Sequence, residues 1–256
     1  MRDNIQRFKS ICKDRGIISA FSKIIPYMFF LAKKKKLEKK WGNVRLKSGD
    51  LEIKVWNTGP KIYWHDTELT KGVGLNTSVF VDGRWHDSSK AKWDMLETGP
   101  SSLKLKNQWR YLPLREIWSI EPLGDNKISC KVELEISKDV EFVEQKFTTM
   151  LSERFEKWAT DTNKGSDFPK FKGWTDIKEA KKDSVFMKAG TKSGKEVPNI
   201  VIKKRDIPRR NFYIQIQNSD YKTKARLLNV VASSRQDRLS YKKGISLFFN
   251  TEISVE

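Results

Sequence analysis

The chain has 256 residues, of which 38% are hydrophobic and 11% aromatic, and this apolar content excludes an intrinsically disordered protein. Its net charge of +19 is uneven: residues 1–41 carry +9, 42–191 carry +2, 192–243 carry +10 and 244–256 carry −2. The near-neutral centre argues against a protein that binds nucleic acid over its whole surface, whereas two local basic patches fit an anionic membrane surface.

Residues 1–42 are predicted to form a basic, amphipathic helical arm. Apolar residues recur in residues 17–29 with a period of about 3.6 residues, as in a helix with one apolar face. This face includes Ile17, Phe21, Ile24 and Met28. A basic run follows it, formed by Lys33, Lys34, Lys35 and Lys36. The apolar stretch is followed by lysines instead of a small-residue cleavage site, and it is too short and polar for a membrane span, so a signal peptide is not expected.

Two interpretations of the arm remain open. In the first, its apolar face packs on the rest of the protein and its lysines are solvated. In the second, the face lies in the lipid boundary and the lysines contact anionic headgroups, each contributing on the order of 1 kcal/mol. The second interpretation predicts a peripheral membrane protein on the cytoplasmic side, with residues 1–40 as the contact.

Residues 43–256 are predicted to form an all-β domain, an antiparallel sandwich or supersandwich. Apolar and polar residues alternate most clearly over 128–136, as in a half-buried strand. Asp82-Gly83 between residues 77–81 and 84–88 predicts a two-residue hairpin turn. Residues 150–183 lack this alternation and are expected to form an irregular insertion with a short helix near 151–158.

The tripeptide Trp-His-Asp occurs twice, as Trp64-His65-Asp66 and Trp85-His86-Asp87, and it contains the only two histidines. Across the predicted hairpin, Arg84 and His86 share one face while Trp85 lies on the other, because side chains alternate along a strand. These residues are either ordinary cross-strand pairs or a ligand site. A metal site is not expected, and no cofactor is expected either.

Glu116 lies on an otherwise apolar stripe with Leu114, Trp118 and Ile120. A carboxylate among apolar neighbours must find a partner or become neutral. Glu116 is therefore either a general acid or base, or one half of an ion pair with Arg110 or another cation.

The segment from residue 64 to 118 is rich in tryptophan, with carboxylates, His and Arg nearby. Aromatic faces and planar polar groups are typical of sugar sites. The candidate ligand-binding residues are Trp64, Asp66, Arg84, Trp85, Asp87 and Trp118. A phosphate-binding loop, a dinucleotide fingerprint, a Gly-x-Ser-x-Gly elbow and a Cys-x-x-Cys motif are all missing from the sequence.

Three motifs together resemble the galactose-mutarotase-like β-supersandwich found in sugar epimerases and in accessory domains of polysaccharide-processing enzymes. These are Gly72-Val73-Gly74-Leu75-Asn76, the Asp82-Gly83 hairpin and Trp109-Arg110-Tyr111, followed by the strand over 128–136. In that family a His acts as acid and a Glu as base in mutarotation. If this chain is an enzyme, Glu116 with His65 or His86 is the expected proton-transfer pair.

The sequence therefore predicts a glycan-directed protein at the cytoplasmic membrane face, binding a saccharide or acting like a mutarotase, with a glycan-assembly enzyme as a possible partner. The alternative is a nucleic-acid-binding or scaffold domain that uses the basic stretch 192–243. In that stretch basic residues flank two aromatic residues that stack on bases. The residues are Lys203, Lys204, Arg205, Arg209, Arg210, Phe212 and Tyr213.

Overall fold

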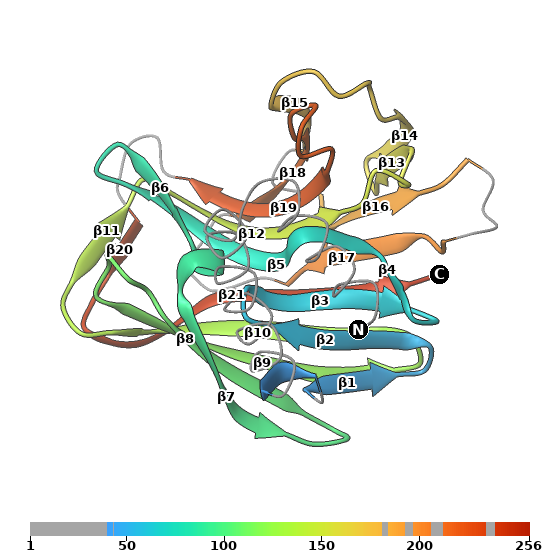
Figure 1. Ribbon diagram of the computed structural model, residues 1–256. Helices are drawn as coiled ribbons and strands as arrows, with labels where there is room; N and C mark the ends of the chain where they lie inside the picture. Colours follow the sequence, from blue (N-terminus) through green and yellow to red (C-terminus); the bar gives the residue numbers. More distant parts are fainter. Residues whose placement is uncertain (1–39, 43, 181–183, 193–196, 206–211, 234–238) are drawn as a thin grey trace, which may run out of the picture. The chain divides into compact units, whose positions relative to one another are not determined.

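The part of the chain that the computed structural model describes consists of antiparallel strands (Figure 1). It covers residues 40–42, 44–180, 184–192, 197–205, 212–233 and 239–256. The chain separates into two units, residues 1–43 and 44–256, and the strands belong to the second. The all-β prediction is confirmed. The arm's predicted contact residues, from Ile17 to Lys36, lie outside the described residues.

The largest sheet has nine strands in the order β14-β13-β16-β17-β21-β10-β9-β8-β7. Along the sheet these are β14 (Asn163–Asp167), β13 (Lys157–Thr160), β16 (Phe186–Gly190), β17 (Ile200–Lys204), β21 (Gly244–Val255), β10 (Lys127–Ile136), β9 (Leu114–Gly124), β8 (Leu103–Gln108) and β7 (Lys92–Thr98). Strand β10 alternates strictly between buried and half-buried residues. The prediction of a half-buried strand over 128–136 is therefore confirmed.

A second sheet has six strands in the order β15-β18-β19-β12-β5-β6. These are β15 (Thr175–Ala180), β18 (Phe212–Asn218), β19 (Arg226–Ser233), β12 (Glu144–Leu151), β5 (Thr70–Val81) and β6 (Arg84–Asp87). Strand β6 has a neighbour on one side only, so it forms an edge of this sheet. The predicted turn at Asp82-Gly83 joins β5 to β6, and both turn residues have positive φ, 50° and 73°.

Two small sheets complete the described fold. The first contains β1 (Arg45–Ser48), β2 (Leu51–Trp56), β3 (Gly59–Trp64) and β4 (Thr67–Glu68). The second pairs β11 (Val140–Phe142) with β20 (Leu239–Tyr241). Gly74 has a φ of 76°, and a Cβ there would lie 2.4 Å from the carbonyl oxygen of Pro60. The glycine thus allows β5 and β3 to approach closely.

The core lies between the nine-stranded and six-stranded sheets. Trp118 of β9 contacts Phe147 of β12 at a ring distance of 5.8 Å, and Phe147 contacts Phe249 of β21 at 5.9 Å. All three side chains are fully buried. Cys130 is also buried, and burial raises the pKa of its thiol. These contacts between two sheets make the described domain a β-sandwich.

The predicted helix near residues 151–158 is wrong. Leu151 is the last residue of β12, pairing with Arg226, and Lys157 begins β13. A turn between these strands brings Phe155 into the core, and the amide of Glu156 donates to the carbonyl of Gly190 at 2.9 Å. Leu151, Phe155 and Trp158 have a helix-like spacing, but a strand, a turn and a second strand bury them. In the described residues, no helix is long and apolar enough to cross a membrane.

Candidate functional site

The second Trp-His-Asp copy lies on edge strand β6. Its register against β5 is as predicted: Val81 pairs with Arg84, Phe80 with Trp85 and Val79 with His86. Trp85 packs against Phe80 at a ring distance of 5.3 Å and still exposes 46% of its surface. Lys146 of β12, the strand on the far side of β5, places its ammonium 4.7 Å from the Trp85 ring centroid. Trp85 is therefore a firmly held aromatic surface that remains open to solvent.

Asp87 ends the strand and starts the next element, a single 3₁₀ turn η1 (Ser88–Lys90). Its carboxylate accepts a hydrogen bond from the amide of Ser89 at 3.1 Å, as an N-cap does. The hydroxyl of Ser89 also donates to it, and the Lys90 ammonium lies 3.5 Å away. Asp87 thus has a structural role in shaping the chain after β6.

A cavity of about 330 Å³ lies beside β6, and we call it the β6 cleft. Its lining residues are Arg84, Trp85, His86, Asp87, Lys90, Ala91, Trp109, Arg110 and Tyr111. The last three belong to the loop between β8 and β9, which is closed by a hydrogen bond from the amide of Trp109 to the carbonyl of Leu114 at 3.1 Å. The structure therefore brings four predicted site residues together with a loop from the other sheet.

The loop residues of the β6 cleft were not among the predicted ligand contacts. Tyr111 is 72% exposed, and its ring lies 6.4 Å from the imidazole of His86. Arg110 is exposed and precedes it. A signal was present in the sequence, because an aromatic-Arg-aromatic triplet directly follows a strand. Sequence spacing could not show that it faces β6.

Glu116 lies in a buried polar cluster behind this cleft. Its carboxylate accepts hydrogen bonds from the Thr77 hydroxyl, from the Asn107 amide at 2.5 Å and from the Trp118 indole at 2.9 Å. Burial raises the pKa of Glu116, and the hydrogen bonds from Thr77, Trp118 and Asn107 oppose this shift. Within the described residues Glu116 has no ion-pair partner, so of the two predicted alternatives the ion pair with Arg110 or another cation is wrong.

Trp109 connects this cluster to the β6 cleft. Its indole lies near enough to lower the pKa of Glu116, although its N–H does not reach hydrogen-bond geometry. Trp109 is 5% exposed, and it also lines the cleft. Glu116 itself is fully buried and is not one of the residues that line the cleft.

Trp118 is not a sugar platform in this structure, which corrects the sequence prediction. Its side chain is fully buried between Trp93, at a ring distance of 5.4 Å, and Phe147. The position of Trp118 on an inward-facing row of β9, opposite Val132 of β10, explains this burial.

The first Trp-His-Asp copy occupies a different setting. His65 and Asp66 form the turn between β3 and β4, and both have positive φ, 41° and 64°. The carboxylate of Asp66 accepts a hydrogen bond from Lys54 at 2.9 Å, and His65 lies 3.6 Å from Asp50. Trp64 contacts His65 edge to face at 4.8 Å. None of the three lines the β6 cleft, so the two copies do not form one site.

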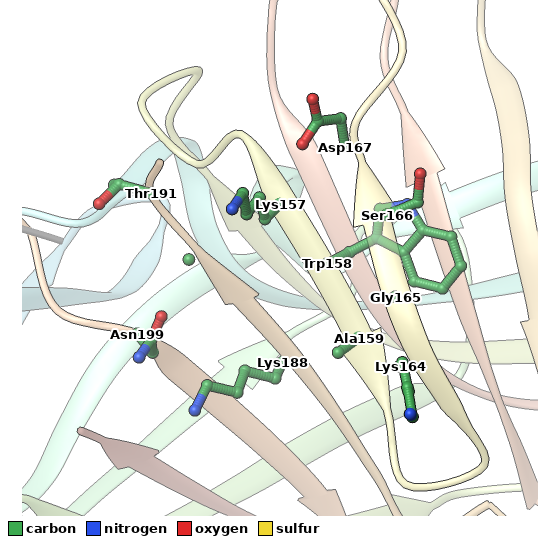
Figure 2. A pocket seen from close by; sticks show the side chains of 11 residues that line it. Lys157, Trp158, Ala159, Lys164, Gly165, Ser166, Asp167, Lys188, Thr191 and Asn199 are labelled. Carbon is green, nitrogen blue, oxygen red and sulfur yellow. The ribbon is translucent and has the colours of Figure 1, made fainter. Parts of the chain in front are cut away.

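A second cavity, of about 390 Å³, lies over the other end of the nine-stranded sheet (Figure 2). We call it the β13 cleft; small residues Ala159, Gly165 and Gly190 line it. Lysines line it as well, namely Lys157, Lys164 and Lys188. Lys188 is already paired with Glu256 at 2.7 Å. The sequence prediction missed this cleft because it treated residues 150–183 as an irregular insertion.

A row of polar residues crosses the six-stranded sheet. Asn76, Thr148, Asn229 and Gln215 lie opposite one another on β5, β12, β19 and β18. Thr148 donates to Asn229 at 2.8 Å, and Asn229 in turn donates to Gln217 at 2.7 Å. Asn229 is fully buried and Thr148 is 6% exposed. Thr148 and Asn229 thus form a buried hydrogen-bonded network and not an open binding surface.

One of the two aromatic residues predicted to stack on bases in the basic stretch 192–243 is buried, whereas the other, Tyr213, is half-buried. Phe212 packs against Phe249 at 5.5 Å and is 5% exposed. The ammonium of Lys204 donates to the Phe212 carbonyl at 2.8 Å, and Arg205 pairs with Glu252. Arg209 and Arg210 lie outside the described residues. Phe212 is therefore unavailable for stacking on a base.

In the described ranges, no group of three or more His, Cys, Asp and Glu side chains is placed to hold a metal ion.

This sandwich is the galactose-mutarotase-like β-supersandwich, as comparison with solved structures shows. The chain resembles a protein of Escherichia coli K12 provisionally assigned as an aldose 1-epimerase, with a TM-score of 0.57 and 13% identity over 83% of this chain and 98% of that one. The chain matches no protein-family model and no curated protein sequence.

Larger carbohydrate-active enzymes contain a similar domain. The GH36 α-galactosidase AgaB of Geobacillus stearothermophilus matches with a TM-score of 0.51 and 10% identity, over 83% of this chain and 39% of the enzyme. An α-mannosidase of Enterococcus faecalis matches with a TM-score of 0.50 and 7% identity, over 84% of this chain and 29% of the enzyme. The chain thus corresponds to about a third of each enzyme, and the likeness concerns the fold.

Proposed function

We propose that the protein binds a saccharide in the β6 cleft. The observation that carries this proposal is the cleft itself, which is lined by the exposed residues Trp85 and Tyr111 and by Arg84, Asp87 and Arg110. Aromatic faces cover the apolar face of a sugar ring, and a few planar polar groups fix its hydroxyls. The fold supports the proposal, since similar structures bear the names of sugar-processing enzymes.

Binding is favoured over catalysis by the position of Glu116. A general acid or base must come within hydrogen-bond reach of the proton that it moves. Glu116 is fully buried and its oxygens already accept three hydrogen bonds. The sequence predicts Glu116 and a histidine as a proton-transfer pair if the protein is an enzyme. The carboxylate of this pair is not accessible to a substrate.

A glycan array with the full-length protein tests this proposal. Trp85→Ala and Tyr111→Ala should each reduce saccharide binding by about tenfold or more, because each removes an exposed aromatic surface. The matched control is Trp174→Ala, since Trp174 is 60% exposed but does not line the cleft. A folded protein that binds no saccharide on the array would reject the proposal, and a nucleic-acid-binding or scaffold role would then be preferred.

We further propose that the protein acts at the cytoplasmic face of a membrane, beside an enzyme of glycan assembly. The support is the sequence of the arm, in which the apolar positions from Ile17 to Met28 precede the run Lys33–Lys36. A helix with this pattern lies in the interface, and its lysines add attraction to anionic lipid.

Sedimentation with vesicles tests the membrane proposal. The full-length protein should sediment with phosphatidylserine-containing vesicles and much less with neutral ones. Replacing Lys33, Lys34, Lys35 and Lys36 with Gln should weaken sedimentation on the anionic vesicles, by on the order of 1 kcal/mol for each lysine. Unchanged sedimentation of this variant would remove the lysine run from the proposal.

A further inference from the structure

The arginines of the described residues differ in the groups with which they pair. Three of the seven pair with a glutamate: Arg45 with Glu52, Arg115 with Glu135 and Arg205 with Glu252. Arg226 donates to backbone carbonyls and to Asn218 instead. The remaining three are Arg84, Arg110 and Arg154. They have no ion-pair or hydrogen-bond partner among the described residues. Two of these three line the β6 cleft.

No carboxylate that lines the cleft pairs with either of these two arginines. Asp87 is its one carboxylate, and this group is held by Ser89 and by Lys90 at 3.5 Å. Lys90 is itself a lining residue. The lining side chains therefore carry an excess of positive charge, because Arg84, Arg110 and Lys90 outnumber the one carboxylate.

Guanidinium groups have a planar fork of donors that matches a carboxylate, sulfate or phosphate group. A neutral sugar does not need such a pair, because its hydroxyls are recognised by amides and carboxylates as well. A cleft lined by exposed aromatic residues and by two arginines without an acidic partner fits a sugar ring that carries an anionic substituent.

We infer that the saccharide bound in the β6 cleft is acidic, with Arg84 and Arg110 contacting its anionic group. This inference rests on the proposed saccharide binding at the same cleft and specifies the class of ligand. Trp85 and Tyr111 contact the sugar ring, whereas the arginines distinguish a charged sugar from a neutral one.

Titration calorimetry with the full-length protein tests the inference. The probes are trigalacturonate, its methyl ester, which keeps the sugar but removes the charge, a sulfated chondroitin tetrasaccharide and free inorganic sulfate. We expect the acidic saccharides to bind at least about tenfold more tightly than the ester, since each charge-assisted hydrogen bond favours the anion. Comparison of trigalacturonate with the chondroitin fragment distinguishes a carboxylate from a sulfate as the preferred group.

The variants Arg84→Gln and Arg110→Gln should each weaken acidic-saccharide binding by about tenfold while leaving binding of the ester nearly unchanged. Arg154→Gln is the matched control, because it removes the same charge from an exposed arginine outside the cleft. An equal loss in this control, or equally tight binding of free sulfate, would mean nonspecific attraction and would overturn the inference.

The two proposals fail in different ways. Equal affinity for trigalacturonate and its ester, lost in Trp85→Ala but kept in both arginine variants, would overturn the acidic ligand while leaving saccharide binding intact. No binding of any saccharide probe by the folded protein would reject the proposed function itself.

Discussion

The two Trp-His-Asp tripeptides have the same sequence but different surroundings. Trp64-His65-Asp66 runs from the end of β3 into a turn, where His65 and Asp66 adopt positive φ and point to solvent. Trp85-His86-Asp87 lies within β6, where alternation sends Trp85 to one face and His86 to the other. The comparison shows that a short motif has no fixed chemistry, because backbone conformation decides which neighbours its side chains meet.

The two copies also differ in the residues that adjoin them. The second copy adjoins a buried polar cluster, since the amide of Thr77 donates to Ser88 at 2.9 Å and the Thr77 hydroxyl donates to Glu116. The first copy is joined to its sheet by exposed contacts such as Lys54 with Asp66. Four predictions test this difference.

The largest expected effect is on Glu116. Glu116→Ala leaves the donors of Thr77, Asn107 and Trp118 buried without an acceptor and opens a cavity, so we expect a loss of about 3 kcal/mol in the free energy of unfolding. Chemical denaturation measures this loss. Glu121→Ala is the control, because Glu121 is an exposed glutamate on the same strand. Similar stability of the two variants would mean that the hydrogen bonds of Glu116 do not stabilise the fold.

The second prediction compares the two tryptophans in ligand binding. Trp85→Ala should weaken saccharide binding by about tenfold or more, whereas Trp64→Ala should leave it unchanged, because only Trp85 lines the β6 cleft. Calorimetry with an array-selected saccharide measures both. Comparable losses in the two variants would place the ligand elsewhere.

A smaller effect is expected from the two aspartates. Asp87→Ala should cost about 1 kcal/mol of stability, since it removes the cap of η1. Asp66→Ala should cost less stability than Asp87→Ala, because the carboxylate of Asp66 is exposed and only the positive φ of this residue disfavours alanine. Thermal unfolding of both variants checks this, and a loss in Asp66→Ala as large as that in Asp87→Ala would contradict it.

The smallest expected effect is a pH dependence from Glu116. Because burial raises its pKa above the ordinary 4.5, the folded protein holds a proton that the unfolded chain has already released. Its contribution to stability is therefore fully present below pH 4.5 and decreases as pH rises from there towards the raised pKa. The stability difference between the wild type and Glu116→Gln should fall over this range.

The wild type and Glu116→Gln contain the same other carboxyl groups. Their difference in stability therefore cancels the pH dependence of those groups, which runs in the opposite direction. A hydrogen bond from Lys242 lowers the pKa of Asp139, for example, so the contribution of Asp139 is present above its ordinary pKa and is lost at lower pH. Denaturation at a series of pH values measures the difference. A difference that grows with pH would show that the hydrogen bonds outweigh burial at Glu116.

Local structure was predictable wherever short-range rules decide it. Asp82-Gly83 specified a two-residue turn because both positions need positive φ, and this turn fixed the register of Trp85 and His86. The alternation of β10 predicted its buried face correctly, from Ile128 to Ile136. The isolated carboxylate of Glu116 was also recognised as unusual from its apolar stripe.

Contacts between distant segments were decided only by the tertiary structure. Trp118 and Phe212 face the core because a second sheet covers them, and neither residue's sequence neighbours reveal that cover. The loop residues Trp109, Arg110 and Tyr111 meet β6 only when the sheets are assembled. Strand alternation and turn geometry are local properties of the backbone, whereas burial, ion pairing and the shape of a cleft depend on which sheets pack together.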